Sequence, residues 1–218
     1  MFRPLAVALA LALPAVAAPP PGETLRTAAT VLDELSQLPV KGIPAGLLAD
    51  AEAVAVFPNL VKAGFVIGGQ GGHGVAVVKS KDGGWGDVRF LHIGGASVGF
   101  QAGVQSSDVV LVFKSRRGLD RLLDGKAKLT LGADASVAAG PIGRDAEVAT
   151  DGKLQAEIVS YGRSRGLFAG ISVSGSVLRA DKRADESFDK DAGPETKKAA
   201  DDLKLKLATM AKPVLARP

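Results

Sequence analysis

The chain has 218 residues, of which 46% are hydrophobic and 23% charged, so it can bury the core of one large domain or two small ones. Its formal net charge of +4 and aromatic content of 5% are too low for a nucleic-acid binder with a dense basic stripe or a stacking platform. With no cysteine there is no disulfide framework or thiolate nucleophile, and two histidines leave little for a metal site. Composition therefore disfavours an enzyme.

The first 17 residues have the features of a secretory signal peptide. Arg3 precedes an apolar stretch over residues 5–13, Pro14 breaks it, and Ala15-Val16-Ala17 fits the small-residue rule for cleavage after Ala17. A short membrane anchor is the alternative. We expect an exported protein, periplasmic or extracellular and peripheral to the membrane. Beyond residues 1–17, we divide the chain into a linker (18–22), one domain (23–193), and a C-terminal helix and tail (194–218).

Helices are predicted near both ends of the chain and in its middle. Apolar residues recur at helical spacing over residues 23–38, a segment that Pro39 ends. Pro44 is suited to the first turn of a short second helix. A third helix follows Arg117 and stops at Gly125. Residues 194–211 form the last, with an apolar stripe of Ala199, Leu203, Leu207 and Met210.

The region between the helices predicts a glycine-rich β core. Residues 64–175 contain 23 of the 27 glycines, and Pro141 is the only proline between Asn59 and Gly193. Alternation predicts strands over 97–105, 131–139 and 166–177, each with an aliphatic face and a small, polar face that packs closely on another layer or lines a wet groove. The run 108–113 is apolar on both faces, and further strands are expected over 53–57, 64–69, 74–80, 89–93 and 156–161.

The fold class is therefore α+β and mainly β. We expect a single domain with an antiparallel sheet core, a sandwich or a partly closed barrel, flanked by the N-terminal, middle and C-terminal helices.

Two glycine motifs suggest chemistry that their surroundings do not support. Gly69, Gly71 and Gly74 match a dinucleotide-binding pattern, but a strand-forming segment follows, so we interpret them as a hairpin turn. Ser97 lies in a G-x-S-x-G pattern but enters an alternating strand where a nucleophile elbow needs a helix. His73, in a glycine loop, and His92, in a strand, are far apart in the chain and form no zinc motif. We predict no catalytic residue, metal or cofactor.

Basic residues form three local clusters in the β region. They are Arg116-Arg117, Lys126 with Lys128, and Arg163-Ser164-Arg165. Arginine forks and neighbouring glycine amides can bind phosphate. The alternative is that these are solvated charges at strand ends.

Several runs of the sequence together resemble the SYLF domain family. They are AVAVFPNLVKAGFVIGG, GGASVGFQAGVQSSDVVLVF, LGADASVAAGPIGR and SYGRSRGLFAGISVSGSVL, and the resemblance covers about residues 45–190. It implies a lipid-binding module without catalytic activity. Eukaryotic relatives bind phosphoinositide-rich membranes, and some fungal relatives bind actin. Membrane contact in those relatives is attributed to a basic N-terminal helix, whereas this chain has Glu23, Asp33 and Glu34 against Arg26 there.

Together these observations predict an exported, non-enzymatic envelope protein that binds anionic phospholipid. The predicted lipid-binding residues are Lys62, Arg116, Arg117, Arg144, Arg163 and Arg165. The alternative is a structural or partner-binding envelope module. An envelope protein is then the partner, and actin is expected only by analogy with the eukaryotic relatives.

Overall fold

The structure, a computed structural model, describes residues 18–37, 42–140, 156–164 and 167–212, with only the backbone for 64–67, 96–103, 164 and 167–170. Its framework is one long antiparallel hairpin of β1 (Ala53–Lys79) and β2 (Trp85–Phe113). At the turn between them, the Ser80 backbone N–H donates to the Gly84 carbonyl at 2.8 Å, and Gly83 has a φ of 86°. The separate short strands predicted across 53–113 are thus merged into two.

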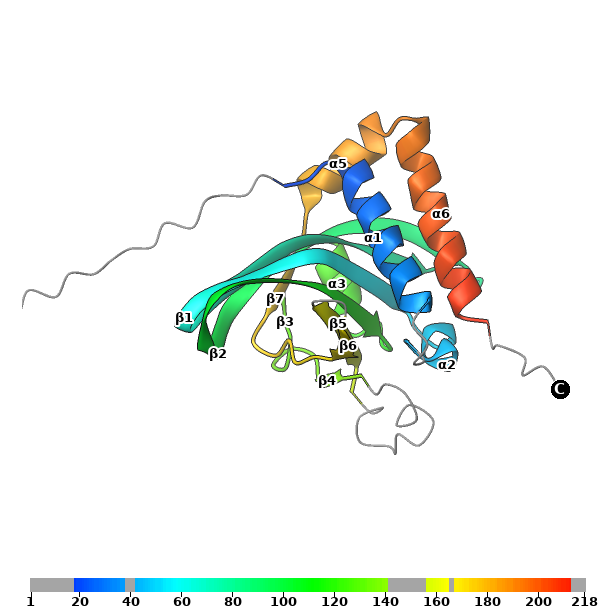
Figure 1. Ribbon diagram of the computed structural model, residues 1–218. Coiled ribbons are helices and arrows are strands. Elements are labelled where there is room, and N and C mark those ends of the chain that lie inside the picture. Colours follow the sequence, from blue (N-terminus) through cyan, green and yellow to red (C-terminus); the bar gives the residue numbers. More distant parts are fainter. Residues whose placement is uncertain (1–17, 38–41, 141–155, 165–166, 213–218) are drawn as a thin grey trace, which may run out of the picture.

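The hairpin bends back on itself, as the curled ribbon in Figure 1 shows. The Lys79 backbone N–H donates to the carbonyl of Glu52 at 2.8 Å, so the end of β1 returns to its beginning. Register shifts between Phe57 and Leu60, and between Gly64 and Val66, let the paired strands bend. The mainly β fold is confirmed, and of the two predicted arrangements the sheet adopts the partly closed barrel.

Gly74 shows why this bend needs glycine. A Cβ at Gly74 would lie 2.5 Å from Cδ1 of Phe57 and would also meet the backbone oxygen of Val56. Two halves of the same strand therefore approach too closely for any side chain at this position. Interpreting Gly69, Gly71 and Gly74 as a hairpin turn was wrong, because all three lie inside β1.

Five shorter strands extend the hairpin into a seven-stranded sheet. The added strands are β3 (Leu129–Thr130), β4 (Val137–Ala139), β5 (Ile158–Ser164), β6 (Leu167–Gly170) and β7 (Val177–Ala180). The order in the sheet is β3-β7-β2-β5-β4, with β1 paired to β2 and β6 paired to β5. All pairs are antiparallel except the parallel pair of β4 and β5.

Two strands predicted from alternation are interrupted by turns. Within the predicted strand 131–139, Gly132 has a φ of 87° and donates to the carbonyl of Ala135 at 2.8 Å. The predicted strand 166–177 is split between β6 and β7 by Gly175, with a φ of 83°. The predictions are therefore confirmed only at β4 and β6, because glycine admits the left-handed backbone of the turns within the two segments.

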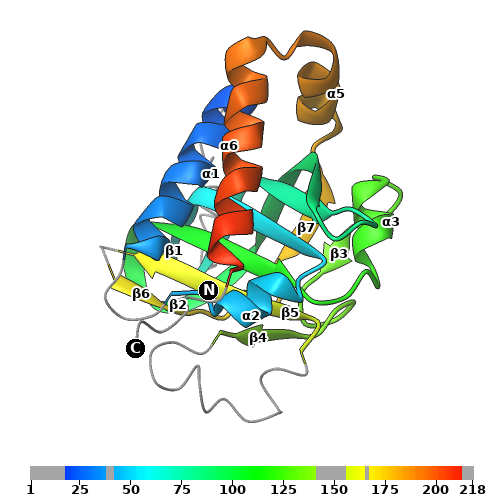
Figure 2. The ribbon, with the colours of Figure 1, turned by 90° about the vertical axis from the view of Figure 1, so that its right-hand side faces the viewer.

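Helices cover one face of the barrel, and Figure 2 shows the two longest, α1 and α6, side by side over it. The predicted helices are confirmed as α1 (Pro21–Ser36), α2 (Ala45–Ala49), α3 (Leu119–Leu123) and α6 (Pro194–Met210). In the described residues, no helix is both long and apolar enough to cross a bilayer.

Alternate residues of the sheet enter two separate cores. Val54, Val56 and Val110 pack under α1 and α6, whose buried stripes include Leu32 and Leu203. Their neighbours Ala53, Phe57 and Leu111 enter the second core with Leu119 and Leu122 of α3. The prediction that residues 108–113 are buried on both faces is thus confirmed from Val109 to Phe113.

A helix that the sequence analysis did not predict, α5 (Lys182–Asp191), follows β7. It has no buried residue, and Phe188 packs on Phe90 with ring centroids 5.6 Å apart. Asp181 caps its first turn by accepting from the Ala184 backbone N–H at 3.2 Å. Asp185 accepts from the backbone N–H of Phe90 at 2.7 Å, which ties α5 to β2.

Candidate anion-binding surface

Arg163, one of the predicted lipid-binding residues, lies in an ion-pair network inside the fold. Its Nε and Nη2 donate to Oδ2 of Asp108 at 3.1 and 2.7 Å, and Nη1 pairs with Glu34 of α1. Burial lowers the pKa of Arg163, but the hydrogen bonds and charges of Asp108 and Glu34 outweigh it, and the pKa is raised. The guanidinium is thus held between β2, β5 and α1.

Asp108 also accepts a hydrogen bond from the backbone of β1. Its Oδ1 accepts from the backbone N–H of Asn59 at 3.0 Å, and Asn59, with a φ of 52°, lies in the register shift that follows Phe57. Asn tolerates this left-handed conformation better than most residues. The buried carboxylate therefore stabilises the bulge of β1 and the position of Arg163 at once.

Gly140 and Tyr161, which lie in the runs that resemble the SYLF family, pack against each other. Tyr161 is fully buried on β5, and a Cβ at Gly140 would lie 2.7 Å from Cε2 of its ring and closer still to other ring atoms. Burial raises the pKa of the Tyr161 hydroxyl. Glycine at 140 thus lets the backbone lie against the aromatic ring.

Arg116 and Arg117 are adjacent in the chain but differ in environment. Arg116 pairs with Glu52 at 3.0 Å and Asp120 at 3.5 Å and also donates to the Lys79 carbonyl, so it clamps the two ends of β1. The side chain of Arg117 is 84% exposed, and its Nε is 4.0 Å from the nearest Glu157 oxygen. Arg117 therefore offers its charge to the solvent, whereas Arg116 is engaged.

The remaining predicted residues lie elsewhere. Lys62 is a half-exposed residue of β1, paired with Gln105 towards the bend of the hairpin, and makes no ion pair within the part of the chain that the structure describes. Arg144 and Arg165 lie outside the described residues. Lys62 and Arg163 lie on the two strands that flank β2, beside Gln105 and Asp108, whereas Arg117 follows the end of β2. Arg117 is therefore apart from the other two.

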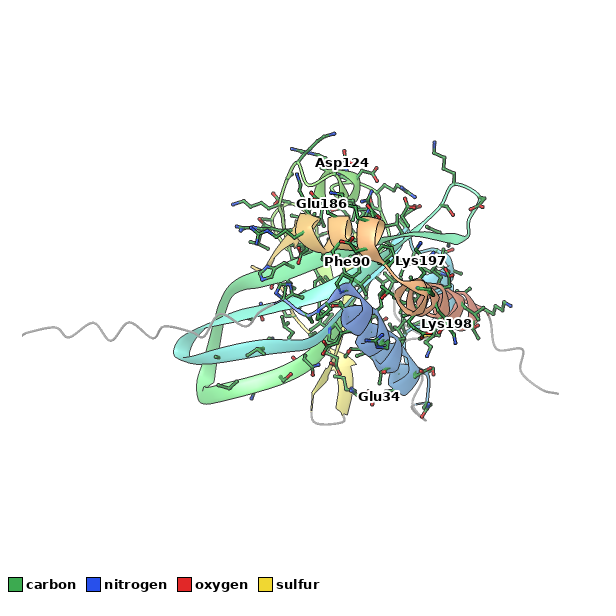
Figure 3. All side chains as sticks on the ribbon, turned by 90° about the horizontal axis from the view of Figure 1, so that it is seen from above. Glu34, Phe90, Asp124, Glu186, Lys197 and Lys198 are labelled. Atoms are coloured by element: carbon green, nitrogen blue, oxygen red, sulfur yellow. The ribbon has the colours of Figure 1, made fainter. Side chains whose placement is uncertain are left out.

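Tertiary structure instead gathers a different set of cations around α3, β7 and the start of α5. We call this set the basic face, and all its members are exposed: Arg121, Lys126, Lys128, Arg179 and Lys182. In the view of Figure 3, nitrogen-tipped side chains surround this end of the molecule near Asp124 and Glu186. Lys126 and Lys128 form a cluster in the sequence, but no local pattern indicates that Arg179 and Lys182, some fifty residues away, belong with them.

Pairing of β3 with β7 brings these cations together. Leu129 is the partner of Leu178, so Lys128 and Arg179 are neighbours one step further along the ladder. The Lys182 side chain lies against Gly125, whose φ is 64°, beside Lys126. Among the described residues, the only ion pair of the basic face joins Lys126 to Asp124 at 2.8 Å.

The two histidines meet at the edge of the basic face, although the sequence separates them. His73 and His92 are cross-strand partners with ring centroids 5.0 Å apart, and Nδ1 of His73 is 3.4 Å from Oδ2 of Asp181. Burial, and then the charge of His73, lowers the pKa of His92. Within the described ranges no cluster of three His, Cys, Asp or Glu side chains is arranged to hold a metal ion.

Ser97 of the hydrolase-like pattern lies in the interior of β2, paired with Gly68 of β1. A nucleophile elbow needs a sharp turn from a strand into a helix, and the backbone here continues as a strand. The motif therefore belongs to the sheet framework.

Comparison with known proteins matches residues 94–197 to the family model Ysc84, described as "Las17-binding protein actin regulator". "SH3 domain-containing YSC84-like protein 1" of Rattus norvegicus is 36% identical over 168 residues, covering 75% of this chain and 49% of the relative. "Protein YSC84" of Saccharomyces cerevisiae is 36% identical over 148 residues, covering 67% of this chain and 31% of the relative. The chain spans about half the length of the YSC84-like relatives it matches. No solved structure matches it.

The bent β hairpin lies under two long helices, and exposed cations gather around α3, β7 and the start of α5; with the family match, this fold is that of a binding module. Matched relatives are named for binding and regulation, which agrees with a non-catalytic module. This chain is a member of the SYLF domain family, the family of Ysc84.

Proposed function

We propose that this SYLF protein is exported and attaches, without catalytic activity, to bilayers that contain anionic phospholipid. The observation that supports this function is the environment of Arg117, whose side chain is 84% exposed and 4.0 Å from its nearest carboxylate oxygen. A guanidinium free to turn towards the solvent can pair with a headgroup phosphate through two parallel hydrogen bonds. Lys62 offers a second, half-exposed cation, and Arg144 and Arg165 remain predicted contacts.

In this proposal, the other two predicted residues act through the framework. Arg116 closes β1, and Arg163 joins β5 to α1, so both hold in place the strands from which the exposed cations project. Their charges are already compensated by Glu52, Asp108 and Glu34. Arg117 and Lys62 are therefore the described members of the set that can contribute directly to lipid binding.

Vesicle sedimentation tests lipid binding. The purified chain is mixed with vesicles of phosphatidylcholine alone, or of phosphatidylcholine with phosphatidylglycerol, at low and high salt. We expect binding to the anionic vesicles only, weakened by salt because screening shortens the reach of exposed charges to about 3 Å at ~1 M. Equal sedimentation with both kinds of vesicle contradicts the proposal.

Arg117→Glu is the variant for this assay, and Arg26→Glu is its matched control. Arg26 is an exposed arginine on α1, so both variants change the net charge equally. Binding should fall for Arg117→Glu more than for Arg26→Glu. Export is tested separately by N-terminal sequencing of the protein recovered from cells: a chain that starts at Ala18 is expected, and an intact Met1 contradicts cleavage.

A second candidate function is the binding of a protein partner. It is favoured by the description of the matching family model and by the name "LAS seventeen-binding protein 3" of a Saccharomyces cerevisiae relative, 34% identical over 148 residues. Chemical cross-linking in cells, followed by identification of the linked species, separates the two functions. Recovery of a protein partner, together with no preference for anionic vesicles, would favour this second function.

A further inference from the structure

We infer that the basic face, Arg121, Lys126, Lys128, Arg179 and Lys182, is the surface by which this domain docks on an anionic bilayer. This inference rests on the proposed function and assigns it to residues outside the set predicted from the sequence. The face is assembled from three elements, α3 with the loop after it, β7, and the start of α5, all held by the β3–β7 pairing and the Gly125–Lys182 contact.

Three nearby carboxylates among the described residues are held by backbone N–H groups and form no ion pair with the cations of this face. Asp134 accepts from the Thr130 N–H at 2.6 Å, Asp181 caps α5, and Asp185 accepts from the Phe90 N–H. Hydrogen bonds from Thr130 lower the pKa of Asp134, with smaller contributions from the charges of Lys128 and Arg121. A carboxylate held by the backbone keeps its charge but has one oxygen fewer for pairing with the surrounding cations, which therefore stay available to a headgroup phosphate.

Asp124 is the exception, since it pairs with Lys126 on the surface. Both side chains are more than half exposed, and such a pair exchanges readily with solvent and ions. A headgroup phosphate can therefore compete for Lys126. The other four cations make no ion pair within the described part of the chain.

The chemistry of the face fits lipid headgroups better than a protein. Protein interfaces depend on apolar and aromatic anchors in a dry centre with few charges. Among the described residues, the large hydrophobic side chains exposed to solvent are Val61, Val104 and Leu205, on β1, β2 and α6. None is on the basic face. Mobile lipid headgroups need no such anchor, because each phosphate can move to the cation that it neutralises.

The acidic composition of α1 agrees with docking through another surface of the domain. Glu34 and Asp33 of α1 hold Arg163 and Lys206, so this helix presents a charge pattern unlike that of a basic membrane helix. The basic face supplies the positive surface that α1 does not.

The test is a double charge reversal with an equal reversal elsewhere. Lys128→Glu with Lys182→Glu removes two lysines of the face, and Lys197→Glu with Lys198→Glu changes two exposed lysines at the start of α6, which Figure 3 labels. The two sites lie at opposite ends of α5, about 15 Å of helix apart, which is beyond the ~8 Å Debye length at physiological salt.

Each protein is titrated with phosphatidylcholine vesicles containing phosphatidylglycerol, and its partition coefficient is measured. We expect Lys128→Glu/Lys182→Glu to lower the coefficient on the order of 10-fold or more, and the α6 pair to change it by less than about threefold. The milder Lys128→Gln/Lys182→Gln variant should lie between them. Circular dichroism and thermal unfolding confirm that each variant is folded.

The other outcomes contradict either the basic face alone or the proposed function as well. If the chain binds anionic vesicles and the reversal on the face changes nothing, the face is wrong while the proposed function stands. If both double reversals weaken binding equally, net charge alone drives it, and the face is again wrong. If the unchanged chain does not prefer anionic vesicles, both proposals fail, and binding of the face to an acidic protein or a nucleic acid would explain its charge instead.

Discussion

Arg163 and the cations of the basic face show how the same chemistry takes opposite roles in two regions. The Arg163 side chain is one-quarter exposed and pairs with two carboxylates, one of them the buried Asp108. Its charge is therefore compensated within the fold. Arg179 and Lys182 are exposed, and the carboxylates beside them are bound to backbone groups. An arginine's role here thus depends on which carboxylates the fold brings to it.

The largest effect expected from this comparison follows removal of the buried partner. Asp108→Ala leaves Arg163 without its main carboxylate and the Asn59 N–H without an acceptor, so we expect a loss of about 3 kcal/mol in the free energy of unfolding. Urea denaturation measures this loss. Asp87→Ala, at an exposed residue of β2, is the control and should cost less than about 0.5 kcal/mol. Equal losses of stability for the two substitutions would show that the buried carboxylate of Asp108 contributes no more to the fold than an exposed one.

Packing of the bent hairpin gives the next largest effect. Gly74→Ala forces a methyl group against Phe57 and the Val56 carbonyl, and we expect a destabilisation of about 1–3 kcal/mol in the same urea experiment. Gly46→Ala places the same methyl group in α2 with no atom within 4 Å, where alanine should stabilise the helix by about 0.5 kcal/mol. A tolerated Gly74→Ala would show that the halves of β1 are further apart than described.

A smaller effect is expected at the edge of the basic face, at His92. Its pKa is lowered below 6.5 by burial and by His73, with Asp181 acting against the shift and Arg179 reinforcing it. The folded protein thus favours neutral His92, so the unfolded chain takes up the proton first. Stability is complete above pH 6.5 and is lost as the pH falls towards the folded-state pKa.

Thermal unfolding between about pH 7 and about pH 5 measures this dependence. His92→Gln should flatten it relative to the unchanged chain. Asp185, whose pKa is raised by burial, acts in the opposite sense in both proteins and cancels in the difference. An identical pH profile for the two proteins would contradict the role assigned to His92.

The smallest effect on stability is expected at the surface ion pair of Asp124 and Lys126, in contrast to the buried pair of Asp108 and Arg163. Asp124→Ala breaks the surface pair with Lys126, and we expect no measurable change in unfolding because solvent replaces the lost partner. The same variant should bind anionic vesicles slightly more tightly, since Lys126 is freed on the basic face. A clear loss of stability would show that this pair contributes to the fold as Asp108 does.

The contrast between these regions was only partly visible in the sequence. Helices α1, α3 and α6 were predicted because apolar spacing, and the stops at Pro39 and Gly125 for the first two, are local signals. Helix α5 was missed because it buries no residue of its own and depends on Asp185 reaching the Phe90 N–H across the fold. Strands were located but not counted correctly, since the bend of β1 at Asn59 needs the distant carboxylate of Asp108.

Candidate site residues show the same division. Arg117 and Arg163 looked alike in the sequence, as basic residues beside glycines, and pairing with Asp108 and Glu34 separates them. Lys126 and Lys128 were noticed as neighbours, but Arg179 joins them only because β3 pairs with β7. Long-range pairing of this kind has no local pattern.

By itself, the sequence determined the family, the mainly β core with helices at both ends, and the predominance of glycine where backbones must touch. Those properties follow from residue size and periodicity, which act over a few positions. Only the tertiary structure decided that the sheet bends into a partly closed barrel, that Arg163 is a framework residue, and that five cations share one surface. Electrostatic roles depend on the distance to partners far along the chain, and folding alone sets those distances.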